Sequence, residues 1–199
     1  MQTPFTSLYH DVFEDILSFW FRDTEPSFWF KKNDAFDALI RERFEAKAIQ
    51  IAASFSPITR PDWLRHTHKN TAQTGLALII ALDQFPRNMY RDTSGAFAWD
   101  SLALRAAIHM INAGEDLQIP QSQRAFIYMP LMHAEDIEIQ NYCVSLIDQR
   151  IDDESTLYHA KKHRDIIEQF GRFPYRNDIL GRQNTDAETL FLKDGGYRP

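Results

Sequence analysis

Two short segments of the chain hold an unusual concentration of arginine. The sequence Phe-Pro-Arg-Asn occupies 85–88, and the related sequence Phe-Pro-Tyr-Arg-Asn occupies 173–177. A guanidinium group presents planar donors that match the two oxygens of a carboxylate or phosphate. If the segments meet, they predict a pocket for an anionic small molecule or an acidic peptide end. The side chains predicted to bind this ligand in and around the segments are Arg87, Asn88, Arg91, Arg172, Arg176, Asn177 and Arg182.

A second interpretation of the same arginines is structural. Arginines near helix ends often pair with neighbouring carboxylates and fix loops against a helical body. The carboxylates available for this are Asp83, Asp100, Glu135 and Asp136. The sequence alone decides neither between the two interpretations nor whether the two segments touch.

The segment 130–140, PLMHAEDIEIQ, carries the candidate residues for proton transfer. On a continuous helix His133, Asp136 and Gln140 would share one face, because they are spaced by three and four residues. Histidine and aspartate are common general acids and bases. We predict His133 as a catalytic base, Asp136 as the carboxylate that orients it, and Gln140 as a ligand-binding residue. This pair would suit a hydrolase of a phosphorylated or carboxylated metabolite, and the alternative is a buried pair that only fixes the arginine segments.

His159 and His163 are four residues apart on a predicted helix, a spacing at which two imidazoles can share a metal ion. No glutamate follows His159 directly, as a zincin motif requires, and two lysines lie between the histidines. We therefore predict His163 to be a hydrogen-bonding residue of the ligand site, and we predict no metal and no cofactor. The lone Cys143 lies in an apolar stretch and is expected to be a small buried side chain in a reducing compartment.

Apolar residues recur at steps of three and four along most of the chain, which predicts amphipathic helices. The stretch 76–82 is apolar throughout, so its helix should be central and should end before Pro86. Pro130 should divide the helical region 121–150 near Leu131, and a loop is predicted over 54–62. We expect a single all-α domain over 1–199, a bundle or helical-hairpin array of about seven to nine helices. The predicted helices occupy 8–20, 33–54, 71–84, 93–112, 121–150 with its break, 153–170 and 186–192.

Composition excludes several classes of function. The chain has 22 Lys and Arg against 28 Asp and Glu, a net charge of −6, so general binding to nucleic acid or to an anionic membrane is not expected. The N-terminus has no basic leader, and the apolar run 76–82 is far shorter than the roughly 18 residues of a membrane helix. We expect a cytoplasmic protein, and the sequence leaves its oligomeric state open.

Several long segments resemble the bacterial family known as domain of unknown function 924. That resemblance implies an all-α fold similar to tetratricopeptide-repeat superhelices, with a protein-interaction scaffold as a third functional alternative, and it implies no established reaction. Tyr175 stands where a histidine is more usual in the family, and Met132 where an acidic residue is expected. A proton-transfer role at 175 would therefore be lost. The segments that carry the resemblance are 16–21, 28–44, 76–91 with LDQFPRN, 126–140 with PLMHAED, and 163–188 with FGRFPYRN.

Overall fold

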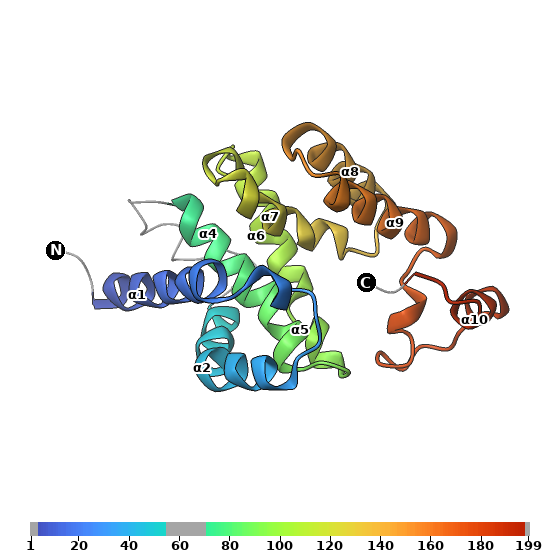
Figure 1. The fold of residues 1–199 in the computed structure, drawn as a ribbon, viewed down its shortest axis with the longest axis horizontal. Coiled ribbons are helices and arrows are strands. Elements are labelled where there is room, and N and C mark those ends of the chain that lie inside the picture. Colours follow the sequence, from blue (N-terminus) through green and yellow to red (C-terminus); the bar gives the residue numbers. More distant parts are fainter. Residues whose placement is uncertain (1–3, 55–70, 198–199) are drawn as a thin grey trace.

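Helices make up all the regular secondary structure of the described residues. The computed structural model describes residues 4–54 and 71–197, so the loop predicted over 54–62 lies almost entirely outside the described residues. The expected all-α class is confirmed (Figure 1). The α-helices are α1 Pro4–Ser18, α2 Asp34–Ala53, α4 Thr71–Ile79, α5 Phe85–Met89, α6 Asp100–Asn112, α7 Gln121–Met132, α8 Ile137–Arg150, α9 Glu154–Phe170 and α10 Asp186–Lys193.

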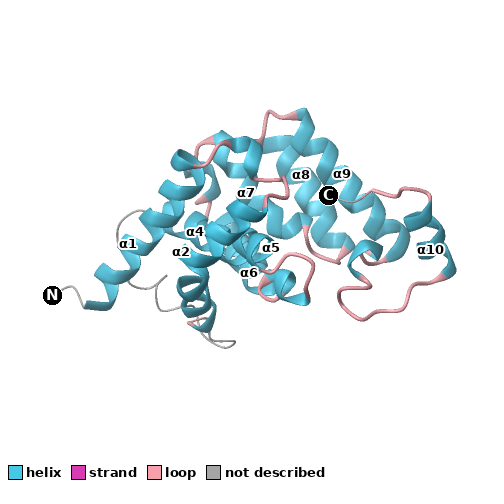
Figure 2. Ribbon diagram, turned by 60° about the horizontal axis from the view of Figure 1, so that its bottom comes forward, coloured by secondary structure: helices cyan, strands magenta, loops and turns pink. Residues whose placement is uncertain are grey.

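The helices pack one after another from the N-terminal to the C-terminal side of the molecule. Helix α1 packs on α4, and α2 packs on α5. Helix α6 packs on α4 and α7, and α8 packs on both α7 and α9. Figure 1 and Figure 2 both show α10 at the end of the molecule opposite α1. Residues 76–82 are fully buried, which confirms the central position predicted for this stretch.

The prediction that the central helix ends before Pro86 is wrong. A π-helical turn, Ile80–Gln84, follows α4 and leads directly into α5, where Pro86 lies in the first turn. A proline is tolerated there because first-turn residues need no N–H partner within their own helix. The π turn buries Asp83 and Gln84 among apolar residues. Such turns often mark functional positions in helices.

The predicted break near Leu131 is also wrong, because Pro130 lies inside α7 and the chain breaks after it. His133 is the C-terminal cap of α7, and Asp136 is the N-terminal cap of α8. The Asp136 carboxylate accepts hydrogen bonds from the backbone N–H groups of Glu138 and Ile139, the ordinary action of an N-cap aspartate. The continuous helical face predicted for His133, Asp136 and Gln140 is therefore not formed.

The remaining predicted helices agree with the structure to within about two residues except at two starts. The first helix, predicted from residue 8, begins at Pro4. A short 3-10 turn, Ser94–Phe97, precedes α6, so the helix predicted from residue 93 begins at Asp100 instead. The capping box predicted at the start of α10 is present, with Thr185 and Glu188 bonding each other's backbone N–H. A small separate apolar cluster packs the C-terminal part of α9 against the loop that follows it, through Ile166, Ile167 and Phe173.

The aromatic core predicts a large effect of one substitution in α2. Phe44 is fully buried, and its ring centroid lies 5.0 Å from that of Phe19 and 4.7 Å from that of Phe85. Phe44→Ala should lower the free energy of unfolding by about 3–5 kcal/mol in urea titrations, because it leaves a cavity. Leu39→Ala is the control on the same helix. Leu39 is 46% exposed, so its loss should change stability by less than about 0.5 kcal/mol. Equal effects would contradict this description of the core.

Candidate functional site

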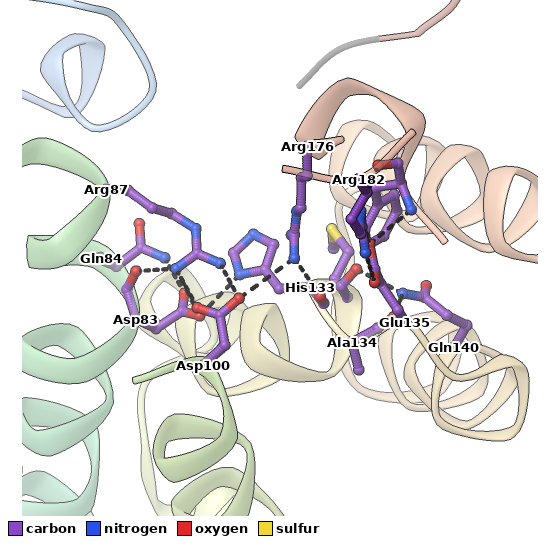
Figure 3. A network of polar contacts seen from close by, with 12 residues as sticks. Asp83, Gln84, Arg87, Asp100, His133, Ala134, Glu135, Gln140, Arg176 and Arg182 are labelled. Atoms are coloured by element: carbon purple, nitrogen blue, oxygen red, sulfur yellow. Dashed lines mark hydrogen bonds and ion pairs between the residues drawn. The ribbon is translucent and has the colours of Figure 1, made fainter. Parts of the chain in front are cut away.

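The two Phe-Pro segments meet at the carboxylate of Asp100, at the start of α6. From α5, Arg87 contacts both oxygens, at 3.0 Å from Nη1 to Oδ1 and 3.1 Å from Nη2 to Oδ2. From the other segment, Arg176 Nη1 lies 3.5 Å from Oδ2. Figure 3 shows the two arginines converging on Asp100 from opposite sides with His133 between them. We call Asp83, Arg87, Asp100, His133 and Arg176 the arginine–histidine cluster.

The carboxylate that orients His133 is Asp83, in the π turn. Its Oδ1 lies 2.9 Å from His133 Nδ1 and 3.3 Å from Arg87 Nη1. Burial opposes ionisation of Asp83, but the charge of Arg87 and the hydrogen bond with His133 outweigh it and lower its pKa to about 2. Asp83 is thus an anion at neutral pH.

His133 is neutral at the same pH. Burial is the main cause that lowers its pKa, and the positive charge of Arg87 adds to it, against the attraction of Asp83. The ionised Asp83 accepts a hydrogen bond from Nδ1–H, so the lone pair of the neutral imidazole lies on Nε2. The orienting role predicted for Asp136 is therefore wrong, since Asp136 caps α8. One sequence feature could have identified Asp83 as a site residue: it is an acidic residue that directly follows the fully apolar helical run 76–82.

Arg176, the second guanidinium of the cluster, combines burial with a donor that has no partner within the described residues. Its side chain lies among aromatic rings, with Cζ 4.6 Å from the ring centroids of both Phe97 and Phe173. Nη1 donates to the backbone oxygen of His133 at 3.2 Å. The residue is only 5% exposed, and its buried Nε has no hydrogen-bond partner among the residues that the structure describes.

His163, on α9, lies next to the cluster. Its ring centroid is 6.2 Å from that of His133 and 5.5 Å from that of Phe173. Nδ1 lies 2.8 Å from the backbone oxygen of His159, while the buried Nε2 contacts no donor in the described part of the chain. Burial lowers the pKa of His163 to about 3. Within residues 4–54 and 71–197, no three His, Cys, Asp or Glu side chains are grouped so that they could hold a metal ion.

The other predicted arginines each have a carboxylate of their own outside the cluster. Arg91 pairs with Asp37 through two nitrogens, at 2.8 and 3.0 Å. Arg172 pairs with Glu188 at 2.6 and 2.8 Å, which lowers the pKa of Glu188 to about 2. For these arginines, and for Arg182, the structural interpretation agrees with the observed contacts. Arg182 holds Glu135 at 2.6 and 3.0 Å.

The predicted amide residues brace the loops. Asn88 donates to Asp37 at 2.8 Å, and Asn177 accepts from Arg182 Nε at 2.8 Å. Gln140 donates to the backbone oxygens of Met132 and Ala134, both at 2.7 Å, and so holds the turn between α7 and α8. His133 lies between these two residues, so Gln140 fixes the backbone on both sides of His133.

Comparison with known proteins identifies the family. The pattern of the family described as "Bacterial protein of unknown function (DUF924)" matches residues 16–196. The chain belongs to this family. A search of curated proteins returned no match. Among solved structures, this DUF924 chain is similar to the protein of unknown function ATU0120 from Agrobacterium tumefaciens. The TM-score is 0.83 with 38% sequence identity, over 94% of this chain and 99% of that one.

None of the helices within the described residues combines the length and the apolar character that crossing a bilayer requires.

The buried charge of Asp83 predicts the effect of Asp83→Asn. The substitution removes the anion that pairs with Arg87 and His133, so the free energy of unfolding at pH 7 should fall by roughly 3 kcal/mol. This value is the lower end of the range for a broken buried ion pair, because Arg87 still pairs with Asp100. The folded pKa of Asp83 lies below its usual 3.8. Its stabilising contribution is therefore complete above pH 3.8 and is lost as the pH falls toward 2.

Urea unfolding at several pH values between 2 and 7 measures both effects. The loss of stability on acidification should be smaller in Asp83→Asn than in the unmodified protein. Asp148→Asn on α8 is the control, because Asp148 is exposed. If Asp83→Asn were as stable as the control at pH 7, the Asp83 contacts would not stabilise the fold.

Proposed function

We propose that this protein binds an anionic small molecule or an acidic peptide end at the arginine–histidine cluster. The observation that carries the proposal is the buried Nε of Arg176, which has no partner among the described residues. A buried donor without a partner costs about 1–3 kcal/mol. An oxygen of a bound anion at Arg176 would satisfy this donor and offset that cost.

Partial exposure of the cluster supports access by a ligand. The side chains of His133, Arg87 and Asp100 are 14%, 20% and 23% exposed, while Asp83 behind them is fully buried. The binding set is smaller than the sequence predicted. Arg87 and Arg176 hold the anion beside His133 and His163. The paired residues Arg91, Arg172 and Arg182, together with Asn88, Asn177 and Gln140, maintain the loops.

A thermal-shift screen with phosphorylated and carboxylated metabolites tests binding, because a ligand of the native state raises Tm. Arg176→Lys keeps the positive charge but removes the planar fork, so a compound that raises Tm of the unmodified protein should bind about tenfold more weakly to this variant. Arg172→Lys is the matched control, since Arg172 lies in the same segment but bonds Glu188. An unchanged response in Arg176→Lys, or no response to any compound, would refute the proposal.

A hydrolase is the second candidate, and the contact between Asp83 and His133 favours it. A neutral imidazole whose Nδ1–H bonds a carboxylate can accept a proton at Nε2. In this reaction Nε2 takes a proton from water while the water oxygen attacks a carbonyl carbon or a phosphorus atom. The leaving oxygen then receives that proton from the imidazolium, and Arg87 and Arg176 stabilise the developing negative charge.

Hydrolysis of p-nitrophenyl acetate and p-nitrophenyl phosphate tests this candidate. His133→Gln should reduce kcat/KM by about 100-fold or more. His109→Gln, which changes a histidine of α6, is the control. Because the pKa of His133 is lowered from 6.5, the activity of the unmodified protein should decline only as the pH falls below 6.5, when the base becomes protonated. Equal rates for His133→Gln and the control would exclude His133 as the base.

The finer properties expected from the sequence stay predictions. These are the similarity to tetratricopeptide-repeat superhelices with the interaction scaffold it would imply, the cytoplasmic location, the lack of nucleic-acid and membrane partners, and the single-domain organisation over 1–199. Affinity capture of one stoichiometric partner would favour the scaffold over the two candidates above.

A further inference from the structure

The hydrogen-bonding roles of the two histidines constrain what the arginine–histidine cluster can bind. His163 Nδ1 lies 2.8 Å from the backbone oxygen of His159. A carbonyl oxygen only accepts, so Nδ1 must carry the proton. The ring is neutral, because burial lowers its pKa to about 3. Nε2 is therefore an acceptor, and it is buried without a donor among the described residues, in a side chain only 2% exposed.

His133 presents a second acceptor by the same argument. Its Nδ1 faces the ionised carboxylate of Asp83 at 2.9 Å and must donate to it. The Nε2 atom keeps its lone pair. The rings of His133 and His163 are 6.2 Å apart between centroids, and Arg176 donates to the backbone oxygen of His133. The two acceptors and the unpartnered Nε of Arg176 thus belong to one neighbourhood.

The formal charge of this neighbourhood is balanced. Arg87 and Arg176 contribute two positive charges, Asp83 and Asp100 contribute two negative charges, and both histidines are neutral. An anion that only accepts hydrogen bonds would gain the donors of Arg176. It would also approach the oxygens of Asp100 and the lone pairs of the histidines, which it cannot bond. Buried acceptors left unpaired in this way reduce affinity.

Resting on the proposed function, we infer that the ligand carries a hydrogen-bond donor, an O–H or N–H group, beside its anionic group, so that the donor bonds the imidazole acceptors while the anion bonds Arg176. This class includes a protonated phosphate or phosphate monoester and hydroxy- or amino-carboxylates. Fully deprotonated, donor-free anions bind more weakly. A site built around buried acceptors discriminates strongly against analogues that lack the matching donor.

Inorganic phosphate and sulfate provide the test, because they are tetrahedral oxyanions of similar size. At pH 7 phosphate keeps at least one proton, whereas sulfate has none. Isothermal titration of the full chain at constant ionic strength should show phosphate binding about tenfold more tightly than sulfate, the effect of one hydrogen bond to a buried group. His163→Phe removes the acceptor but keeps a ring, so it should weaken phosphate binding and reduce this preference. Arg176→Lys should weaken both anions together.

The outcomes separate this inference from the proposed function. Equal affinities for phosphate and sulfate in the unmodified protein would overturn the inference and leave the anion site in place. Binding of neither anion would overturn the proposed function and the inference with it. The comparison of the two anions is made on the unmodified chain, so it decides the matter even if His163→Phe does not fold.

Discussion

A negative charge in the centre of a helical protein must be neutralised locally, and Asp83 is such a charge. Its carboxylate is fully buried on the π turn between α4 and α5. Arg87, one helical turn later, and His133, from the end of α7, supply the neutralising contacts. Each partner is fixed in turn, Arg87 by Asp100 and the turn that contains His133 by Gln140. The positions of α5, α6 and α7 in this region therefore depend on one ionised group.

Asp100 extends the same constraint to the C-terminal part of the chain. Because it accepts from both Arg87 and Arg176, it joins two segments that are almost ninety residues apart in sequence. The aromatic rings of Phe97 and Phe173 lie on Arg176 and exclude water from most of it. Low local polarity strengthens the ion pairs and also makes each unpartnered polar atom costly. The arginine–histidine cluster thus combines ion pairs with a buried donor, Nε of Arg176, that has no partner among the described residues.

The sequence predicted the helices well and the contacts of the site only in part. Periodicity found α2, α9 and α10 because their apolar faces and caps are local signals. The predicted helix end before Pro86 was wrong because a π-helical turn changes the helical register there, and apolar residues at steps of three and four do not indicate such a turn. Periodicity also failed at His133, where the strong N-cap of Asp136 moved the break beyond Pro130. The common composition of the arginine segments indicated that they were related. Which arginine pairs with which carboxylate depends on distances between α5, α6 and the segment after α9, and no local pattern contains them.

In the final helix, α10, one side chain couples formation of the helix to its packing on the preceding loop. Glu188 bonds the backbone N–H of Thr185 at the start of α10, and the same carboxylate holds Arg172 in the preceding loop. An eight-residue helix is too short to be stable alone in water. Its first turn is fully capped only when Glu188 is in the position that also pairs with Arg172. Formation of the helix and its packing on the preceding loop therefore occur together. Residues 185–193 should therefore behave as one cooperative unit, whose helical signal reports attachment to the rest of the molecule.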